Sequence, residues 1–337
     1  MKTYFLHGAR DLRLEEVTQP EITDDQLLIE VKYTGICGSD VHYYNHGYCG
    51  RFIPERPFAL GHEFSGIVVK SGKKVDGFPI NSAVAIDPSM PCRKCSFCSS
   101  GRYNLCENMR YFGSASCRPH LDGGFGKYVA VPAENCFILP PNVSLKEASL
   151  LEPLCVALHA VMQAGNVSGK SVLITGGGTI GQLILRVLKS FGATSVTVSD
   201  VSDFAREFSL KSGATSVINP TSPVPDLKEF EIVFEASGAE MALQFALEAI
   251  QRGGTLVQIG SLAETVSIPA NLIMTKELTV KGSFRFANVF KMALSLIDSG
   301  NLKLDGIITS SFPFNEIPTA MDKALNFKNS VKIQIEM

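Results

Sequence analysis

Four cysteines lie close together in one short segment of the chain. Cys92, Cys95, Cys98 and Cys106 follow the pattern C-x2-C-x2-C-x7-C. Four thiolates at this spacing suit a tetrahedral zinc ion with no coordination position left open for chemistry. The ferredoxin-type iron–sulfur pattern has a last gap of three residues followed by proline, whereas here the last gap is seven and Glu107 follows. The segment therefore predicts a structural zinc lobe at about residues 89–109, with redox disulfides as a weaker alternative in a reducing compartment.

A second set of potential metal ligands is dispersed along the sequence: Cys37, the adjacent pair His62 and Glu63, and Glu152. Each alone is weak, since buried cysteines and surface His–Glu pairs are common. Together they fit the three protein ligands and one water of a catalytic zinc. Neighbouring residues in an extended strand point to opposite sides, so His62 and Glu63 both bind only if the backbone bends there. The spacing leaves open whether Glu63 or Glu152 is the direct ligand.

A glycine-rich turn indicates a dinucleotide site. The apolar run Val172–Thr175 leads into G-x-G-x-x-G and then a helical pattern, which places a pyrophosphate at the helix N-terminus. Asp200, nineteen residues after the last glycine, would accept hydrogen bonds from the adenosine ribose and repel the extra phosphate of NADP. Arg206 lies close enough to offset that repulsion, so NAD is favoured and NADP stays open. The expected cofactor contacts are Gly176, Gly178, Thr179, Ile180, Gly181, Asp200, Arg206, Ile259 and Phe284.

The elements that position these residues fall into two patterns. Up to about Pro141, short apolar runs are broken by Gly, Pro and Asp-rich turns, which predicts a β-rich region. A capping box at Ser144 then predicts a helix that continues through Met162. Beyond it, strands alternate with helices, which predicts a doubly wound parallel sheet. The predicted strands are Val172–Thr175, Ser195–Ser199, Ile232–Glu235, Thr255–Ile259, Leu278–Lys281 and a closing Lys332–Ile335; the predicted helices are Ile180–Phe191, Asp203–Ser212, Glu240–Gln251 and Val289–Ser299.

Length and composition narrow the class of protein. The 337 residues suggest two domains, and a net charge of −2 without basic blocks argues against nucleic-acid binding. No apolar run approaches the roughly 20 residues of a membrane span. The first residues lack a signal-peptide core, so a cytoplasmic protein is expected.

The motifs together resemble a known family. Gly61-His62-Glu63-x2-Gly66-x5-Gly72-x2-Val75 matches the zinc pattern of the medium-chain, zinc-containing alcohol dehydrogenase superfamily, and the resemblance extends over essentially the whole chain. Glu152 stands where the alcohol dehydrogenases carry a second cysteine ligand, which resembles the polyol dehydrogenase branch. Four further segments resemble its polyol and sugar-acid enzymes: Cys37–Tyr44, Met109–Ala115, Pro119–Phe125 and Gly282–Phe286.

The resemblance implies an α/β architecture with two domains. Residues 1–146 and 284–337 would form a β-rich, GroES-like catalytic domain, and residues 147–283 a Rossmann domain, with the active site in the cleft. Family members pair subunits along the Rossmann edge strand, here near 278–282, which implies a homodimer or homotetramer.

It also implies roles for single residues. Cys37, His62 and Glu63 would bind a catalytic zinc, which acts on the substrate hydroxyl as a Lewis acid, while Glu152 holds the remaining water. Ser39 would accept the first proton, with Glu152 as the rival base. Tyr43 and Arg285 would contact the substrate, and an arginine fork suits a sugar-acid carboxylate. Each of these residues also has a purely structural interpretation: Ser39 as a helix cap, Tyr43 as a packed aromatic and Arg285 as a surface guanidinium.

The reaction expected from this family is hydride transfer from a secondary alcohol of a sugar acid or polyol to the nicotinamide. Phe286 replaces a tyrosine of the sorbitol branch, which weakens a sorbitol interpretation. Threonine and sugar-alcohol-phosphate dehydrogenases are further alternatives; a phosphate substrate would need an extra basic cluster, and none is obvious in the sequence. The competing class is a catalytically silent zinc- and nucleotide-binding protein, which the intact set of candidate ligands disfavours.

Overall fold

The chain forms two compact units. The computed structural model describes residues 1–116, 118–222, 229–326 and 329–337. The first unit contains Met1–Glu152, Phe290–Ser299 and Leu304–Met337, and the second contains Pro153–Val289 and Gly300–Lys303. The chain enters the second unit within α4 (Leu151–Ala164) and leaves it just before α9 (Phe290–Asp298). Both points at which the chain passes between the units come later in the sequence than the expected domain boundaries at 146/147 and 283/284.

The first unit is built on a seven-stranded sheet with the order β16-β17-β3-β4-β5-β9, in which β8 also pairs with β3. Its C-terminal strand β17 runs antiparallel to β3, with Gln334 opposite Gly35. The two ends of the sequence therefore meet in one sheet. The strands are β3 (Gln26–Gly35), β4 (Glu63–Ser71), β5 (Ala83–Ile86), β8 (Tyr128–Pro132), β9 (Cys136–Ile138), β16 (Ile308–Pro313) and β17 (Lys332–Glu336).

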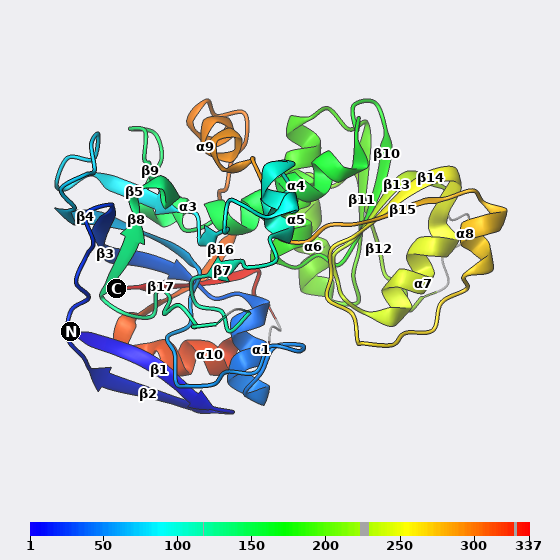
Figure 1. The fold of residues 1–337 in the computed structure, drawn as a ribbon. Helices are drawn as coiled ribbons and strands as arrows, with labels where there is room; N and C mark the ends of the chain where they lie inside the picture. Colours follow the sequence, from blue (N-terminus) through cyan, green and yellow to red (C-terminus); the bar gives the residue numbers. More distant parts are fainter. Residues whose placement is uncertain (117, 223–228, 327–328) are drawn as a thin grey trace. The chain divides into compact units, whose positions relative to one another are not determined.

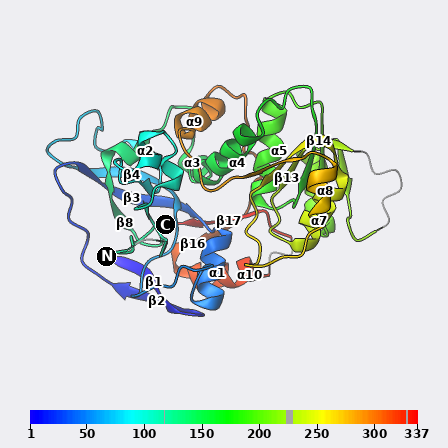
Figure 2. The same cartoon turned by 45° about the vertical axis from the view of Figure 1, so that its right-hand side comes forward.

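Smaller elements surround this sheet. The hairpin of β1 (Lys2–Gly8) and β2 (Asp11–Glu16) lies beside α1 (Gly38–His46) and α10 (Ile317–Leu325) in Figures 1 and 2. Apolar side chains from β1, α1 and α10, among them Leu6, Tyr43 and Met321, share one core. The cysteine lobe contains β6 (Ser89–Met90), α2 (Ser96–Ser99), η1 (Tyr103–Leu105) and β7 (Arg110–Tyr111); η2 (Ala133–Asn135) and η3 (Phe314–Glu316) are single turns elsewhere.

The helix predicted to run from Ser144 through Met162 is in fact two helices. The capping box is present, because the Ser144 hydroxyl accepts a hydrogen bond from the Glu147 N–H at 3.2 Å. The helix it starts, α3 (Leu145–Ala148), ends after one turn, and α4 begins at Leu151. Pro153 explains the break, since it has no N–H to donate to the carbonyl of Ser149.

The second unit is a six-stranded, all-parallel sheet with the order β12-β11-β10-β13-β14-β15. Numbered within the unit this is 3-2-1-4-5-6, the Rossmann arrangement, which confirms the predicted fold class. β10 is fully buried from Val172 to Ile174, as strands covered on both faces are. The strands are β10 (Ser171–Thr175), β11 (Ser195–Ser199), β12 (Ser216–Ile218), β13 (Phe230–Glu235), β14 (Ile250–Gln258) and β15 (Thr279–Gly282).

The helices of this unit follow the predicted alternation. The three predicted ones are α5 (Thr179–Ser190), α6 (Asp203–Lys211) and α7 (Glu240–Ala249). The short α8 (Asn271–Thr275) was not predicted, and it lies beside α7 in Figure 2. The prediction extended α7 to Gln251 and began the next strand at Thr255, whereas β14 already starts at Ile250. Among the described helices, none combines the length and apolar character needed to cross a membrane.

Candidate active site

Three candidate ligands from distant parts of the sequence converge in the first unit. One ligand atom each from Cys37, His62 and Glu63 lies within 4.8 Å of the others. Cys37 follows β3 and caps the N-terminus of α1, while Glu63 is the first residue of β4. Because β3 and β4 are paired, with Gly35 opposite Glu63, the sheet itself brings these segments together.

The bend required for His62 and Glu63 to share a site is present at Gly61. This glycine has φ +89°, a conformation that L side chains rarely adopt, and a Cβ there would lie 2.6 Å from the Phe125 ring. The chain turns at Gly61 before β4 begins, so His62 stands outside the regular strand alternation. Both side chains can therefore face one ion.

The imidazole of His62 faces a buried carboxylate with one of its two nitrogens. Its Nδ1 lies 3.7 Å from Oδ1 of Asp40, which is 0 % exposed. Asp40 accepts hydrogen bonds from the N–H groups of Cys37 at 2.9 Å and Gly61 at 3.3 Å. Burial lowers the pKa of His62, but the charges of Asp40 and Cys37 outweigh it and raise that pKa above its ordinary value. With Nδ1 facing Asp40, Nε2 is the nitrogen left for a metal.

Glu63 forms a buried ion pair with Lys332 of β17. Lys332 is 2 % exposed, and its ammonium group also donates to the carbonyl of Ile36 at 2.9 Å. Burial alone would lower the pKa of Lys332, but the Glu63 carboxylate outweighs it and raises that pKa. Gly35 leaves the room for this pair, because a Cβ there would lie 2.0 Å from Glu63 Oε2.

Glu152 is close enough to His62 and Glu63 to interact with their charges, but it is not one of the three residues that converge within 4.8 Å. Its Oε1 accepts a hydrogen bond from the Tyr111 hydroxyl at 2.7 Å, and the Tyr111 ring lies 5.8 Å from that of His62. Burial raises the pKa of Glu152 to about 7. A thiolate, an imidazole and a carboxylate that converge as Cys37, His62 and Glu63 do fit a zinc ion.

The predicted substrate and proton contacts have different surroundings. Ser39 lies in the first turn of α1, where Cys37 and Asp40 form the cap, so Ser39 is not the capping residue. Tyr43 is 1 % exposed, and its hydroxyl accepts a hydrogen bond from the Ala115 N–H at 3.1 Å. Arg285 belongs to the second unit, and its guanidinium carbon lies 5.0 Å from the centre of the Phe284 ring.

The cysteine lobe forms a second group of ligands. The sulfur atoms of Cys92, Cys95, Cys98 and Cys106 lie within 4.8 Å of one another. Backbone N–H groups of Lys94 and Cys95 lower the pKa of Cys92 to about 6, while burial raises that of Cys98 to about 12. All four thiols converge on one point from a single loop, and four sulfur ligands fit a closed structural zinc.

The glycine-rich turn of the second unit lies between β10 and α5. Gly176 has φ +97°, and a Cβ on Gly181 would lie 1.9 Å from the Gly176 carbonyl oxygen. At Gly178, by contrast, a Cβ would meet nothing within 4 Å, and this residue caps the N-terminus of α5. Thr179 and Ile180 begin the helix. The turn thus combines close internal packing with open space where a pyrophosphate would approach.

Asp200 follows β11 and is fixed by backbone donors. Its carboxylate accepts hydrogen bonds from the N–H groups of Gly177 and Ser202, both at 2.7 Å. Arg206 donates to the Asp200 carbonyl at 2.7 Å and pairs with Asp203. The arginine that was expected to offset repulsion of NADP is therefore engaged with the chain itself. Of the remaining expected contacts, Ile259 donates its N–H to the Glu235 carbonyl at 2.8 Å, and Phe284 is 52 % exposed.

Sequence reasoning missed several residues that hold these sites. Asp40, Tyr111 and Lys332 pack around the metal ligands. Glu235, 0 % exposed at the end of β13, accepts hydrogen bonds from the N–H of Gly238 at 3.0 Å and the Gln258 amide at 2.6 Å. An acid that closes a buried strand could have drawn attention to Glu235; Lys332 had no comparable signal.

Two family models match the chain. Residues 23–141 match the alcohol dehydrogenase GroES-like domain, and residues 179–299 match the zinc-binding dehydrogenase domain. Together they span both units.

Individual relatives agree with these models. A probable D-xylulose reductase A from Aspergillus clavatus is 37 % identical over 94 % of this chain and 92 % of its own length. Sorbitol dehydrogenase from Bacillus subtilis is 33 % identical over 98 % of this chain and 95 % of its own. The crystal structure of L-idonate 5-dehydrogenase from Escherichia coli K-12 superposes with a TM-score of 0.95 at 32 % identity, covering 100 % of this chain and 98 % of the other.

Proposed function

Since this chain belongs to the zinc-binding, NAD(P)-dependent alcohol dehydrogenases of the medium-chain superfamily, we propose that it oxidises a secondary hydroxyl of a sugar acid. The observation that carries the proposal is the convergence of Cys37, His62 and Glu63 beside the Glu152–Tyr111 pair. A set of three ligands leaves a coordination position for substrate, which the four-cysteine lobe does not.

In the proposed site Cys37, His62 and Glu63 hold the catalytic zinc. Glu63 is preferred over Glu152 as the third ligand because its carboxylate belongs to the converging group, whereas Glu152 is engaged by Tyr111. A zinc bound there supplies a Lewis acid that lowers the pKa of the substrate hydroxyl. Cys92, Cys95, Cys98 and Cys106 hold the second, structural zinc.

The chain's own residues then handle the proton and the orientation of the substrate. Ser39, two residues after Cys37, is the proposed first acceptor of the hydroxyl proton, and Glu152 is the rival base through an ordered water. Tyr43 acts mainly by packing, since its buried hydroxyl already holds the Ala115 backbone. Arg285 remains the proposed contact for an acidic group, because a guanidinium fork matches a carboxylate.

NAD is the proposed cofactor, bound by the glycine-rich turn and Asp200. The Asp200 carboxylate is fixed by two backbone N–H groups and would face the ribose hydroxyls. Arg206 pairs with Asp203 and so is not free to receive the extra phosphate of NADP.

The proposed reaction is the oxidation of L-idonate to 5-keto-D-gluconate, in which NAD gains a hydride and one proton is released. The resemblance of the segments around Cys37, Met109 and Arg285 to sugar-acid enzymes supports this substrate, as does the Escherichia coli relative. Sorbitol or another polyol is the alternative, supported by the Bacillus subtilis relative, and threonine is a weaker one.

We further propose a cytoplasmic homodimer or homotetramer. β15 lies at one end of the parallel sheet, and an open edge strand needs covering.

The test is NAD and NADP reduction by the purified protein on L-idonate, sorbitol, L-threonine and galactitol 1-phosphate, each with a zinc-chelated control. Zinc-dependent turnover of L-idonate above the others supports the proposal. Preference for a different substrate would support zinc-dependent alcohol oxidation but overturn the assignment of L-idonate as the substrate. Absence of turnover from protein that holds two zinc ions and binds cofactor favours the catalytically silent alternative.

A further inference from the structure

Three arginines from two separate segments of the chain line one pocket of the first unit. The pocket has a volume of about 420 Å³, and Arg51, Arg110 and Arg118 form part of its wall together with Phe52 and Ala115. Its volume is that of a cavity for a small molecule. No basic cluster is obvious in the sequence here, because Arg51 lies far before the other two and seven residues without a basic side chain separate Arg110 from Arg118.

The charges of these arginines are poorly balanced. Within the described part of the chain, neither Arg51 nor Arg110 has an acidic side chain at ion-pair distance, and Nε of Arg110 is buried without a hydrogen-bond partner. Arg118 pairs with Glu55 at 2.6 Å. Glu107 is the one acidic residue among the described residues that line the pocket. A buried guanidinium nitrogen without an acceptor is costly, so an anionic ligand would satisfy an unmet requirement of this wall.

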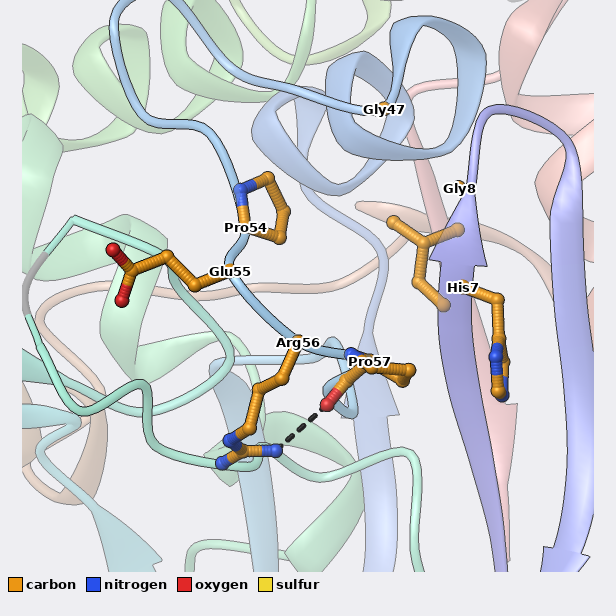
Figure 3. A pocket seen from close by; sticks show the side chains of 8 residues that line it. His7, Gly8, Gly47, Pro54, Glu55, Arg56 and Pro57 are labelled. Atoms are coloured by element: carbon orange, nitrogen blue, oxygen red, sulfur yellow. Dashed lines mark hydrogen bonds between the residues drawn. The ribbon is translucent and has the colours of Figure 1, made fainter.

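A second cavity in the same unit provides a contrast. It has a volume of about 190 Å³ and contains Arg56 in its wall, beside Pro57 and His7 (Figure 3). The Arg56 guanidinium donates to the carbonyl of Pro57 at 2.7 Å and to that of His120 at 2.9 Å. Its donors are thus used by the protein, whereas Nε of Arg110 has no hydrogen-bond partner among the described residues.

The arginine pocket is connected to the candidate active site through its own wall. The N–H of Ala115 donates to the hydroxyl of Tyr43, which lies on the helix capped by Cys37. Arg110 precedes Tyr111, whose hydroxyl holds Glu152. Phe52 and Ala115 pack in the same core as Tyr43. A ligand in this pocket therefore shares its supporting residues with the metal ligands.

We propose that this pocket binds the oxyanion of the substrate, a carboxylate or phosphate at the end of a polyol chain. Arg51 lies over the Phe52 ring, with its guanidinium carbon 5.7 Å from the ring centre, and this stacking orients its donors. A planar guanidinium binds two oxygens of such a group at once. The inference rests on the proposed function and changes one of its assignments, since it gives the acidic end of that substrate to Arg51, Arg110 and Arg118 in place of Arg285.

The test compares substrates that differ in charge and variants that differ in position. Arg51→Gln and Arg118→Gln remove exposed donors from the pocket, and Arg13→Gln on β2 removes an exposed arginine elsewhere in the first unit. We expect each pocket variant to lose about tenfold in kcat/KM on L-idonate or galactitol 1-phosphate, mainly through KM, and to keep sorbitol turnover within about twofold. Whichever anionic compound is preferred identifies the acidic group.

A binding measurement separates this inference from the proposed function. Inorganic phosphate, titrated into the zinc-loaded protein by calorimetry, should bind the wild type and Arg13→Gln, bind Arg51→Gln more weakly, and compete with the anionic substrate. Binding without competition would make this a separate anion site and overturn the assignment to substrate. Equal losses on neutral and anionic substrates, or a charge preference removed by Arg285→Gln alone, would also overturn it. If no compound is turned over, the proposed function fails. The phosphate titration alone then tests whether the arginine pocket binds an anion, and absence of phosphate binding would contradict the inference.

Discussion

At the scale of single residues, the candidate metal site depends on an ion pair enclosed in the protein. Glu63 and Lys332 are 1 % and 2 % exposed, and both lie in strands adjacent to β3. Charges taken out of water are costly unless they are paired with good geometry. The absence of a side chain at Gly35 makes that geometry available, because any Cβ there would occupy the place of the Glu63 carboxylate.

Gly35→Ala should therefore displace the ion pair and weaken the zinc site. A Cβ would lie 2.0 Å from Glu63 Oε2 and 2.9 Å from Lys332 Cε, so both side chains must move. We expect the free energy of unfolding to fall by about 3 kcal/mol and the zinc content to fall towards about one per chain. Gly282→Ala is the matched control, since a Cβ at that strand glycine meets nothing within 4 Å. A Gly35→Ala protein that keeps two zinc ions and full stability would contradict this role.

Asp87, which follows β5, gives the stability of the first unit a defined pH dependence. It is 8 % exposed, and its Oδ1 accepts hydrogen bonds from the Ser89 N–H at 2.9 Å and hydroxyl at 2.5 Å. Burial raises the pKa of Asp87 to about 6. Its ordinary value in an unfolded chain is about 3.9. The folded protein thus binds the Asp87 proton more tightly than the unfolded chain does. The contribution of this proton to the free energy of unfolding is therefore complete below about pH 4 and is lost as pH rises through about 6.

Asp87→Asn cannot ionise and should lose this dependence. Relative to the wild type, its free energy of unfolding should rise between pH 4 and pH 6 by up to about 3 kcal/mol and then stay level. Urea unfolding at several pH values measures the difference, with the exposed Asp76→Asn as control. A difference that stays constant with pH would contradict the assignment.

The sequence identified the candidate ligands that converge in the structure, but it did not identify the residues that support them. Cys37, His62 and Glu63 carry side chains whose chemistry is diagnostic when they occur together. Asp40 and Lys332 do not, because a lone aspartate or lysine is ordinarily a surface residue. Only the pairing of β17 with β3 shows that Lys332 is buried beside Glu63.

At the scale of elements, the dinucleotide motif rests on how β10 meets α5. The parallel sheet places the glycine-rich turn, Asp200 and Ser237 after three neighbouring strands, β10, β11 and β13. Ligands of such sheets bind at the carboxyl ends of the strands, where the strand order reverses. Here that point lies between β10 and β13.

Two glycine substitutions separate packing from cofactor approach. Gly181→Ala should destabilise the second unit and weaken NAD binding, because its Cβ would lie 1.9 Å from the Gly176 carbonyl oxygen. Gly178→Ala should weaken NAD binding by about tenfold or more with little change in melting temperature, since its Cβ meets only open space. Fluorescence titration and thermal unfolding measure the two effects. If Gly178→Ala binds NAD as the wild type does, the phosphates lie elsewhere.

Element boundaries were the part of the fold that sequence patterns placed least well. The break between α3 and α4 was missed because Leu145–Met162 has a continuous helical pattern, and the effect of Pro153 on the Ser149 carbonyl was not weighed. β12 was not predicted, since its three residues carry too little periodicity. The doubly wound parallel sheet followed from the alternation itself, whereas the order of its strands comes from the structure.

At the scale of the whole molecule, the chain divides its chemistry between two units. The first unit contains both sets of candidate metal ligands, and the second contains the dinucleotide motif. The arginine pocket shows what sequence spacing could not give. Arg51 joins Arg110 and Arg118 in one pocket wall only through the folding of the first unit, which the spacing in the sequence does not indicate.

The central claim is zinc-dependent hydride transfer from a secondary alcohol to NAD, and isotope transfer tests it most directly. The best substrate of the panel, deuterated at the carbon that is oxidised, is incubated with NAD, and the reduced cofactor is examined by mass spectrometry. The account predicts one deuterium in the reduced cofactor, none after removal of zinc from Cys37, His62 and Glu63, and recovery when zinc is restored. Reduced cofactor without deuterium, or transfer that persists after this zinc is removed, would contradict it.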